Sequence, residues 1–286
     1  MKTLIETLFE LLITLAKGVF ELICFIFQVN SNEKLYDHSQ MLGKDKRKLF
    51  SRFNKGIIVN GKKRISIKQS LTHVLIVGKS GSGKTSSIYK VALLTAKNEN
   101  FVITDLDGDL LKTCSGHLAQ KGYNIQVLDL NNVSLSAFFC PLSYCETIDE
   151  LKALAEQIIL SSGASKGSSD QFWNYSASNL LFLLFRLIKT QPTEYQNLTN
   201  VLHLLNLFES DGFKEFVSCN TEGTLFDDYL SFISKDIKLR TSILATLGAT
   251  LSLFSYNDIA YVTSKNTIDF KSLTRKTKQA LFIIVP

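Results

Sequence analysis

Residues 78–85 carry the pattern in this chain that most directly implies a chemistry. Their sequence, Gly-Lys-Ser-Gly-Ser-Gly-Lys-Thr, fits the phosphate-binding P-loop pattern G-x-x-x-x-G-K-[ST]. Glycines let a backbone turn tightly and bring its N–H groups against phosphate oxygens. We expect Lys84 to reach the β- and γ-phosphates of ATP and the Thr85 hydroxyl to hold Mg²⁺. The predicted ATP-binding residues are Gly78, Lys79, Ser80, Gly81, Ser82, Gly83, Lys84, Thr85 and Ser86.

The sequence on either side of the loop predicts the strand and the helix that a P-loop needs. Val74–Val77 is a short apolar, branched run, which is typical of a buried parallel strand. A helix that begins near Lys84 would add its positive N-terminal end to the phosphate site. Its apolar positions recur at helical spacing at Ile88, Val91, Ala92, Leu94 and Ala96. A Gly/Ser-rich surface loop is the alternative interpretation of the same residues.

A further candidate for the nucleotide site follows the next apolar run. Residues 101–105 are typical of a strand that ends in a carboxylate, Asp105, and such an acid can hold Mg²⁺ through water. Because this strand comes directly after the P-loop helix, the alternative is a structural role, with Asp107 or Asp109 capping a helix. Residues 125–130 predict another strand, so the order β-α-β-α-β indicates a parallel sheet.

The pattern changes to helices at about residue 146. Thr147–Glu150 is a capping box, and the periodicity predicts helices over 148–159, 172–188, 198–208 and 237–254. No strand signal of weight occurs between 146 and 258, and strand character returns at 281–286. Before the P-loop, residues 56–67 predict a hairpin around Asn60-Gly61. The sequence therefore predicts an α/β fold that contains an all-α insertion.

Composition excludes some classes of protein. The chain is 45% hydrophobic, which argues against disorder. Its five cysteines form no C-x-x-C pair, and its four histidines flank none of them at metal-ligand spacing. We therefore expect reduced thiols in a cytoplasmic setting rather than a zinc site.

The N-terminal residues combine an apolar segment with a basic block. Residues 1–29 predict a helix with a wide apolar face and charges at positions 2, 6, 10, 17 and 21 on the opposite face. This helix lies in the membrane interface, crosses a bilayer beside partner helices, or packs against the chain's own core. Residues 31–70 hold 11 basic and 3 acidic residues. With the helix in a membrane, that block places the rest of the chain in the cytoplasm.

Four motifs, in order, resemble the ATPase domain of type IV secretion coupling proteins, the TraG/TraD-like conjugative DNA-transfer family. The P-loop with its preceding hairpin is the first. The second is Val102–Asp105 with Gly108, similar to the family's V-V-T-D-P-K-G-E, with its continuation at 122–125 and 141–142. The third is Gln171–Asn174 with Ala177 and Leu180-Leu181, similar to F-W-x-x-A-x-x-L-L. The fourth runs from 241–253 to 282–286, so the resemblance covers about residues 54–286.

The resemblance implies a RecA-like P-loop fold with an all-α domain inserted after its third strand. It also implies ATP and Mg²⁺ as cofactors and a hexameric ring at the cytoplasmic face of the inner membrane. Single-stranded DNA with its attached relaxase, together with secretion-channel proteins, would be the partners. The expected order is a membrane-associated helix at 1–29, a basic linker at 30–55, a nucleotide-binding domain at 56–145, an all-α insertion at 146–258 and the rest of the nucleotide-binding domain at 259–286.

Two departures from the family pattern limit what is carried over. Leu106-Asp107 replaces the Pro-Lys of D-P-K-G, so no role is transferred to these positions. The family's Walker B strand and arginine finger lie beyond the last matched motif, so we expect an N-terminal portion, truncated before Walker B, with no catalytic residue in it. Where family members usually show two clear membrane spans, residues 1–29 offer one weak helix.

Two functions remain open at this stage. The first is an ATP-driven DNA translocase subunit, seen here as its N-terminal portion. The second is a truncated relative that binds ATP without hydrolysing it and acts as an assembly or membrane-docking module. The guanine-reading N-K-x-D and the transporter signature L-S-G-G-Q are both missing from the sequence, so ATP is favoured over GTP and over the transporter class.

Overall fold

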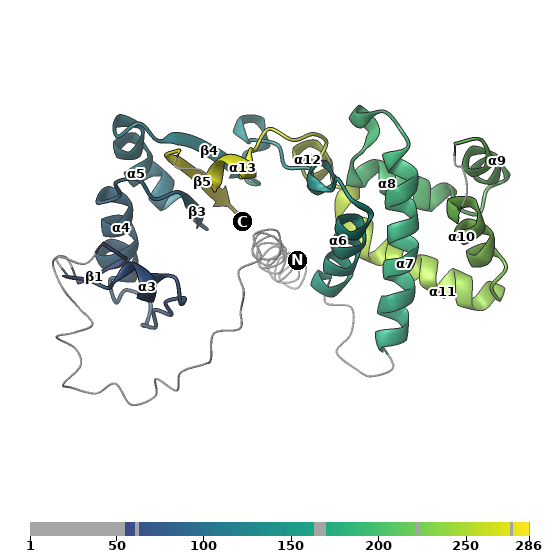
Figure 1. Cartoon of the computed structure of the whole chain (residues 1–286), viewed down its shortest axis with the longest axis horizontal. Coiled ribbons are helices and arrows are strands. Elements are labelled where there is room, and N and C mark those ends of the chain that lie inside the picture. The colour runs from purple at the N-terminus through teal and green to yellow at the C-terminus, as the bar shows by residue number, and fades with distance from the viewer. Residues whose placement is uncertain (1–54, 61–62, 163–169, 221–223, 275–276, 286) are drawn as a thin grey trace. The chain divides into compact units, whose positions relative to one another are not determined.

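The computed structural model describes residues 55–60, 63–162, 170–220, 224–274 and 277–285 (Figure 1). The helix predicted at 1–29 and almost all of the linker predicted at 30–55 lie outside these residues. The described chain divides into two compact units. We call residues 55–126 with 269–284 the sheet unit and residues 127–268 the helical unit, and each is described by itself.

The sheet unit holds the P-loop and the strands, except that residues 127–129 at the end of β4 fall in the helical unit. In chain order its elements are β1 (Ile58–Asn60), β2 (Lys63–Arg64), α3 (Ile67–Ser70), a π-helical turn (Thr85–Tyr89) that continues into α4 (Lys90–Leu94), β3 (Phe101–Thr104), α5 (Asp109–Gln120), β4 (Asn124–Asp129), α13 (Phe270–Leu273) and β5 (Gln279–Ile284). The hairpin predicted at 56–67 is confirmed, because β1 and β2 pair antiparallel. The strands predicted at 101–105 and 125–130 are also confirmed.

The last strand of the described chain lies in the middle of its sheet. The order is β3-β5-β4, and β3 runs parallel to β5 with Phe101 opposite Ala280 (Figure 1). The Asn124 N–H donates to Lys278 O at 2.8 Å, so β4 and β5 also start side by side. Leu281 and Phe282 are almost fully buried, as the centre of a sheet requires. The sheet therefore joins segments far apart in the sequence.

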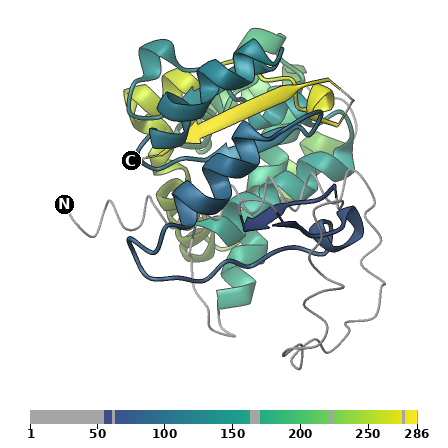
Figure 2. The same cartoon turned by 90° about the vertical axis from the view of Figure 1, so that its left-hand side faces the viewer.

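The strand predicted at Val74–Val77 is wrong. These residues have no regular structure, and Figure 2 shows the chain before α4 as an irregular trace. Leu75 is 88% exposed and Val77 is 85% exposed. A strand is stable only where a neighbour accepts its backbone hydrogen bonds, and the three-stranded sheet of the described residues does not include this segment. Apolar character alone therefore did not fix its conformation.

The helical unit contains helices and no strand after β4 within its described residues. Its helices are α6 (Ile148–Ser161), α7 (Asp170–Lys189), α8 (Leu198–Leu207), α9 (Asp211–Asn220), α10 (Thr224–Ile233), α11 (Ile237–Leu251) and α12 (Asn257–Val262). Short 3₁₀ turns lie at Val133–Leu135, Pro141–Tyr144, Thr193–Tyr195 and Ser252–Ser255. The four helices predicted in this region are confirmed, whereas α9, α10 and α12 were not predicted.

The capping box at the start of α6 forms as expected. Thr147 accepts the Glu150 N–H at 3.3 Å, and the Glu150 carboxylate accepts the Thr147 N–H at 2.9 Å. Helix α7 is deeply buried, with Leu181, Leu184 and Phe185 fully inside the core. This helix contains the one predicted at 172–188.

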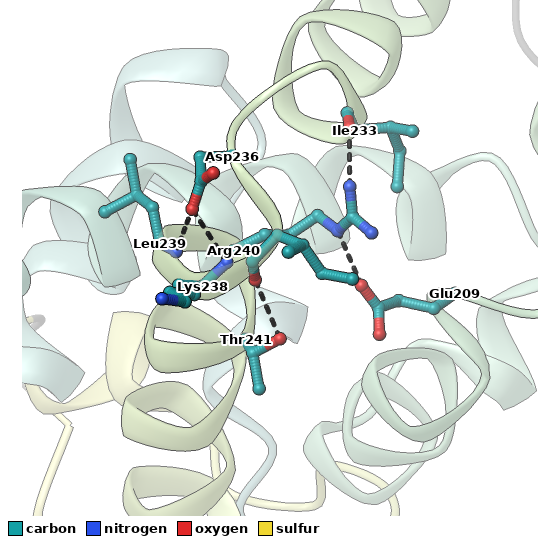
Figure 3. A network of polar contacts seen from close by, with 8 residues as sticks. Glu209, Ile233, Asp236, Lys238, Leu239, Arg240 and Thr241 are labelled. Atoms are coloured by element: carbon teal, nitrogen blue, oxygen red, sulfur yellow. Dashed lines mark hydrogen bonds and ion pairs between the residues drawn. The ribbon is translucent and has the colours of Figure 1, made fainter.

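Arg240, in the first turns of α11, joins three elements of the helical unit (Figure 3). Its Nε donates to Glu209, just after α8, at 2.5 Å, and its guanidinium also donates to Ile233 O, at the end of α10, at 2.7 Å. Asp236 caps the same helix by accepting the Lys238 N–H at 2.9 Å. A predominantly buried guanidinium and an N-cap therefore fix where α11 starts.

The chain enters and leaves the helical unit through two segments that bind each other, residues 137–144 and 262–268, which we call the neck. The Thr267 N–H donates to Phe138 O at 3.0 Å, and the Phe138 N–H donates to the Thr267 hydroxyl at 2.9 Å. The Tyr144 hydroxyl donates to Ile268 O and also lies 3.0 Å from Asn266 Oδ1. The segment that enters the helical unit and the segment that leaves it are therefore hydrogen-bonded to each other.

Within the described residues, one helical stretch, Ile237–Ser255, is long and apolar enough to cross a membrane by length and composition alone. The core helix of a globular protein meets the same criterion. Ile243, Leu247 and Leu251 of this helix are buried in the core of the helical unit.

Candidate functional site

The loop at 78–85 adopts a conformation that requires its glycines. Gly81 and Gly83 have φ angles of +75° and +82°, which residues with a side chain rarely adopt. At Gly78, a Cβ atom would lie 2.6 Å from the Ser82 hydroxyl oxygen. Gly81 and Gly83 therefore have a conformational reason to be glycine, whereas at Gly78 a turn of the Ser82 side chain would make room for a Cβ atom. A loop built in this way exposes its backbone N–H groups to an anion.

Lys84 points back into its own loop. Its Nζ donates to Gly78 O at 2.6 Å and to Lys79 O at 2.8 Å, so the ammonium group is held at the start of the loop. These two carbonyl oxygens are weak, neutral partners for a full charge. A phosphate oxygen is a stronger partner, because charge-assisted hydrogen bonds are about twice as strong as neutral ones. The predicted loop residues Gly78, Lys79 and Lys84 are therefore brought together around one cation.

Three hydroxyl side chains follow the lysine at the start of the helix, namely Thr85, Ser86 and Ser87. The Ser86 hydroxyl donates to Gly83 O at 3.2 Å. Thr85 and Ser86 are both exposed, so both side chains are accessible to a ligand at the loop. The helix has no side-chain cap at this end. Its first N–H groups are therefore left for an anion, as in other phosphate sites at helix starts.

Asp105 is buried and stabilises the start of α5. It is 5% exposed, and its carboxylate accepts the Leu111 N–H of α5 at 2.8 Å. Its own N–H donates to Ile283 O of β5 at 2.9 Å. Gly108, with φ +67°, lets the chain turn from β3 into α5. The helix-capping role expected for Asp107 or Asp109 is therefore performed by Asp105, and its described hydrogen bonds do not reach the loop at 78–86.

The residues of the loop would take a magnesium ion only together with a nucleotide. Among the described residues, no group of three His, Cys, Asp or Glu side chains could hold a metal ion. Mg²⁺ is commonly bound through one or two protein groups plus substrate phosphates. The Thr85 hydroxyl supplies one such group, so the donor set fits Mg²⁺ that arrives with phosphates.

The comparison with family sequence models decides the family. The model described as "Type IV secretory system Conjugative DNA transfer" matches residues 30–286. The chain belongs to this family. It is a type IV coupling protein, as the order of its motifs indicates. No curated protein matched the chain.

Solved structures show that this coupling-protein chain shares the fold of known relatives. It is similar to the bacterial conjugative coupling protein TrwBdeltaN70 in its unbound monoclinic form, with a TM-score of 0.61 and 16% identity. It is similar to TrwB in complex with ADP and Mg²⁺, and to TrwBdeltaN70 in its trigonal form with sulphate, each with a TM-score of 0.60 and 14% identity. At this identity the likeness shows the mixed α/β fold with its parallel sheet.

The chain spans about half the length of these structures. The match covers 84% of this chain and 51% of TrwBdeltaN70 in its unbound form. For the ADP complex and the sulphate form, the match covers 84% of this chain and 52% of each.

Two features near the loop of this coupling protein were not predicted from sequence. The first is the π-helical turn at Thr85–Tyr89, in which the Lys90 N–H donates to Thr85 O, five residues back. The second is an ion pair of 2.8 Å between Lys90 and Asp109. No sequence pattern indicates which residues of two separate helices will form an ion pair. The only sequence signal at the π turn is the run of three hydroxyl residues.

Proposed function

We propose that this chain is the nucleotide-binding portion of a conjugative coupling motor, with the P-loop at Gly78–Thr85 and Ser86 as its ATP site. The observation that carries the proposal is the Lys84 ammonium, held by Gly78 O and Lys79 O inside a loop that depends on glycine backbone geometry. That arrangement keeps one positive charge and several backbone N–H groups at one place. The TrwB structure in complex with ADP and Mg²⁺ supports the same ligand here.

Calorimetric titration with ADP and Mg²⁺ tests the nucleotide site. Replacing Lys84 with Ala removes the charged partner of the phosphates, so we expect the affinity for ADP to fall roughly 10- to 100-fold. Lys112→Ala in α5 is the matched control, because Lys112 is an exposed lysine of the same unit that lies outside the loop. Equal affinities in the wild type and in Lys84→Ala would reject the P-loop as the ATP site.

Charge supports the sheet unit as the part that contacts single-stranded DNA. Residues 55–126 and 269–286 contain 15 basic and 5 acidic residues, whereas residues 127–268 contain 9 basic and 15 acidic residues. A chain of phosphates is attracted to the first set and repelled by the second. The proposal therefore assigns DNA contact to the sheet unit and leaves the acidic helical unit for protein partners, with the relaxase and secretion-channel proteins as candidates.

Fluorescence anisotropy with a single-stranded oligonucleotide tests this assignment. Binding should weaken steeply with salt, and replacing one exposed lysine of the sheet unit, such as Lys68→Ala, should lower the slope of log K against log salt by about 0.7 if it contacts a phosphate. Lys214→Ala in α9 is the control, since Lys214 is exposed but lies in the acidic unit. Affinity that does not change with salt would contradict DNA binding through phosphates.

A second candidate function is ATP binding without hydrolysis. Two strands of the sheet end at a carboxylate, and both acids are engaged with backbone N–H groups. Asp105 accepts from Leu111, and Asp129 accepts from Asn131 and Asn132. These contacts orient each carboxylate toward its own segment of the chain, and none of the described hydrogen bonds of either acid reaches the loop at 78–86. We expect the 286-residue chain alone to turn over ATP more slowly than about 1 per second, and faster turnover that Lys84→Ala abolishes would exclude this function.

Assembly and location are part of the first proposal. We infer a hexameric ring at the cytoplasmic face of the inner membrane, associated through residues 1–29, in keeping with the family. Flotation of the full chain with vesicles, compared with a chain that starts at residue 30, tests the membrane contact. If both chains float equally well, residues 1–29 do not provide the membrane contact. Mass photometry with and without ADP and Mg²⁺ measures the size of the assembly.

A further inference from the structure

The helix that follows the P-loop begins with a turn that is one residue longer than a turn of an α-helix. The Ser87 N–H donates to Gly83 O at 2.8 Å, four residues back, as in an α-helix. The Lys90 N–H instead donates to Thr85 O, five residues back, so the turn Thr85–Tyr89 is π-helical. π turns are rare and occur preferentially at functional sites. This one lies directly against the loop that would hold phosphates.

The far end of this helix is fixed by α5. Lys90 pairs with Asp109 at 2.8 Å. His117 of α5 and Lys121, directly after α5, bind Leu94 O at 3.0 Å and 2.6 Å, and Lys121 also donates to Ala96 O at 3.1 Å. These contacts hold α4 by its first residue and by its last turn. Any change in the winding of the turn at 85–89 must therefore be taken up on the side of the P-loop.

The loop on that side is free to take up such a change. The described contacts of Lys84 are to carbonyl groups of its own loop, at Gly78 and Lys79. Leu75 and Val77, just before the loop, are exposed. Gly83 lies directly before the helix, and glycine tolerates changes of φ that other residues do not. Rewinding the π turn to an α turn would move this side by about 1.5 Å along the axis and about 100° around it.

Thr85, Ser86 and Ser87 each carry a hydroxyl group. A shift of the helix by one residue therefore replaces one hydroxyl group by the next at the same place along the helix. In the π form the Lys90 N–H bonds Thr85 O, whereas in an α-helix it would bond Ser86 O. Ser86 then takes the place along the helix that Thr85 holds in this structure, and Thr85 moves toward the loop. We propose that the turn Thr85–Tyr89 is a register switch of the nucleotide site, which rewinds from π to α when phosphates displace the loop carbonyls from Lys84.

The switch rests on the proposed nucleotide function and adds a specific claim to it. In the bound register Thr85 faces the metal, and in the register described here it lies one position further along the helix. Because rewinding costs free energy, the chain binds nucleotide with a lower apparent affinity than it would if the turn were already in the bound register. The Lys90 N–H, whose partner changes from Thr85 O to Ser86 O, lies beyond the loop that touches the ligand.

Hydrogen exchange on the full chain tests the proposal. Exchange is followed by mass spectrometry or NMR at the amides of residues 88–91, with no ligand and with saturating ADP and Mg²⁺. We expect slower exchange at these amides with ligand, in addition to protection of the loop amides at 78–86. Protection confined to the loop, with no change at 88–91, would overturn the register switch and leave the nucleotide site in place. No binding of ADP at millimolar concentration would instead overturn the nucleotide site itself.

A deletion separates rewinding from simple ligand contact. Removing Ser87 leaves the P-loop pattern intact and places Thr85 O four residues before the Lys90 N–H, so the turn becomes α-helical while Thr85 keeps the place along the helix that it holds in this structure. We expect this variant, fixed in the ligand-free register, to bind ADP at least severalfold more weakly than the wild type and to lose the ligand-dependent change at 88–91. Ser87→Ala keeps the length of the turn and is the matched control, expected to behave as the wild type. A folded deletion variant that binds ADP as tightly as the wild type would contradict the switch, and if the variant does not fold, the exchange result on the wild type decides.

Discussion

Lys90 of α4 and Asp109 of α5 form an ion pair of 2.8 Å that joins the helix after the P-loop to the helix after β3. The Lys90 side chain is 25% exposed and that of Asp109 is 54% exposed. Asp109 also lies in the first turn of α5, where a negative charge is favoured by the helix dipole. The pair therefore links two elements of the sheet unit and stabilises one helix end.

Asp109→Asn should lower the stability of the sheet unit only slightly. Because the pair is partly exposed, solvent screens it, and we expect a loss of about 0.2–1 kcal/mol in the free energy of unfolding. Urea denaturation at low and at high salt measures this, and the difference between the two proteins should shrink at high salt. The exposed neighbour Asp107 provides the control, as Asp107→Asn breaks no described ion pair.

Asp105→Ala should destabilise the sheet unit more strongly. The substitution leaves the Leu111 N–H of α5 without its acceptor in a buried place, which costs about 1–2 kcal/mol. Asp105→Asn keeps an acceptor oxygen and should cost less. Denaturation curves of the two variants, with Asp107→Ala beside them, test the capping role. If Asp105 also assists Mg²⁺, Asp105→Asn will reduce the Mg²⁺ dependence of ADP binding, whereas a purely structural role leaves that dependence unchanged.

Tyr144→Phe should loosen the neck without unfolding the helical unit. The variant loses the hydrogen bond to Ile268 O and the contact with Asn266, with an expected cost of about 1–2 kcal/mol. Hydrogen exchange should rise at residues 262–268, where the chain leaves the helical unit. Tyr195→Phe changes an exposed tyrosine and serves for comparison. Unchanged exchange at 262–268 in Tyr144→Phe would mean that the backbone contacts at Phe138 hold the neck alone.

Arg240→Met should separate the ends of α8 and α10 from α11. Its guanidinium serves Glu209 and Ile233 O together, so we expect a loss of about 1–3 kcal/mol in the helical unit. Glu209→Gln should cost less, because the Glu209 side chain is 46% exposed and the bond to Ile233 O survives. Lys238→Ala, which changes an exposed side chain of the same helix, should have little effect. Thermal unfolding followed by circular dichroism ranks the three variants.

Thiol reactivity should separate the cysteines by burial. Burial raises the pKa of Cys145 to about 12, although the nearby Lys189 acts in the opposite direction. At pH 8 this thiol should react about 10³-fold more slowly than an ordinary thiol, and faster as the pH rises toward its pKa, because the thiolate is the reactive form. Among the four cysteines of the described residues, Cys219 is exposed and should be alkylated first. Peptide mass spectrometry after iodoacetamide gives both rates, and equal rates in the native chain would contradict the burial of Cys145.

Local signals in the sequence predicted the parts of the fold that depend on local physics. The capping box at Thr147 marked the start of α6, and the apolar periodicity after residue 172 marked α7. The glycines of the P-loop indicated a backbone that needs positive φ, and Gly81 and Gly83 have it. Helices α9 and α10 were not predicted, although α10 carries apolar residues at helical spacing, at 225, 226, 229, 232 and 233, which could have revealed it.

Features that depend on contacts between residues far apart in the chain could not be predicted from the sequence. Val74–Val77 looks like a strand, yet whether it becomes one depends on a neighbour that its own residues do not specify. Asp105 follows an apolar strand, as an acid of a metal site often does. Only its hydrogen bond from the Leu111 N–H shows that it caps a helix. The central position of β5 is of the same kind, because strand order is decided by long-range pairing.

The position of β5 sets an order of events during synthesis on the ribosome. Asn100 and Gln279, which bond each other at 2.9 Å where β3 and β5 begin, are 179 residues apart in the chain. At about 5–20 residues per second, β3 waits roughly 10–35 s for the strand that pairs with it. The helical unit emerges in full during that interval and can fold first. The nascent chain therefore carries an unfinished sheet, and a chaperone that protects unpaired β3 would act in this interval.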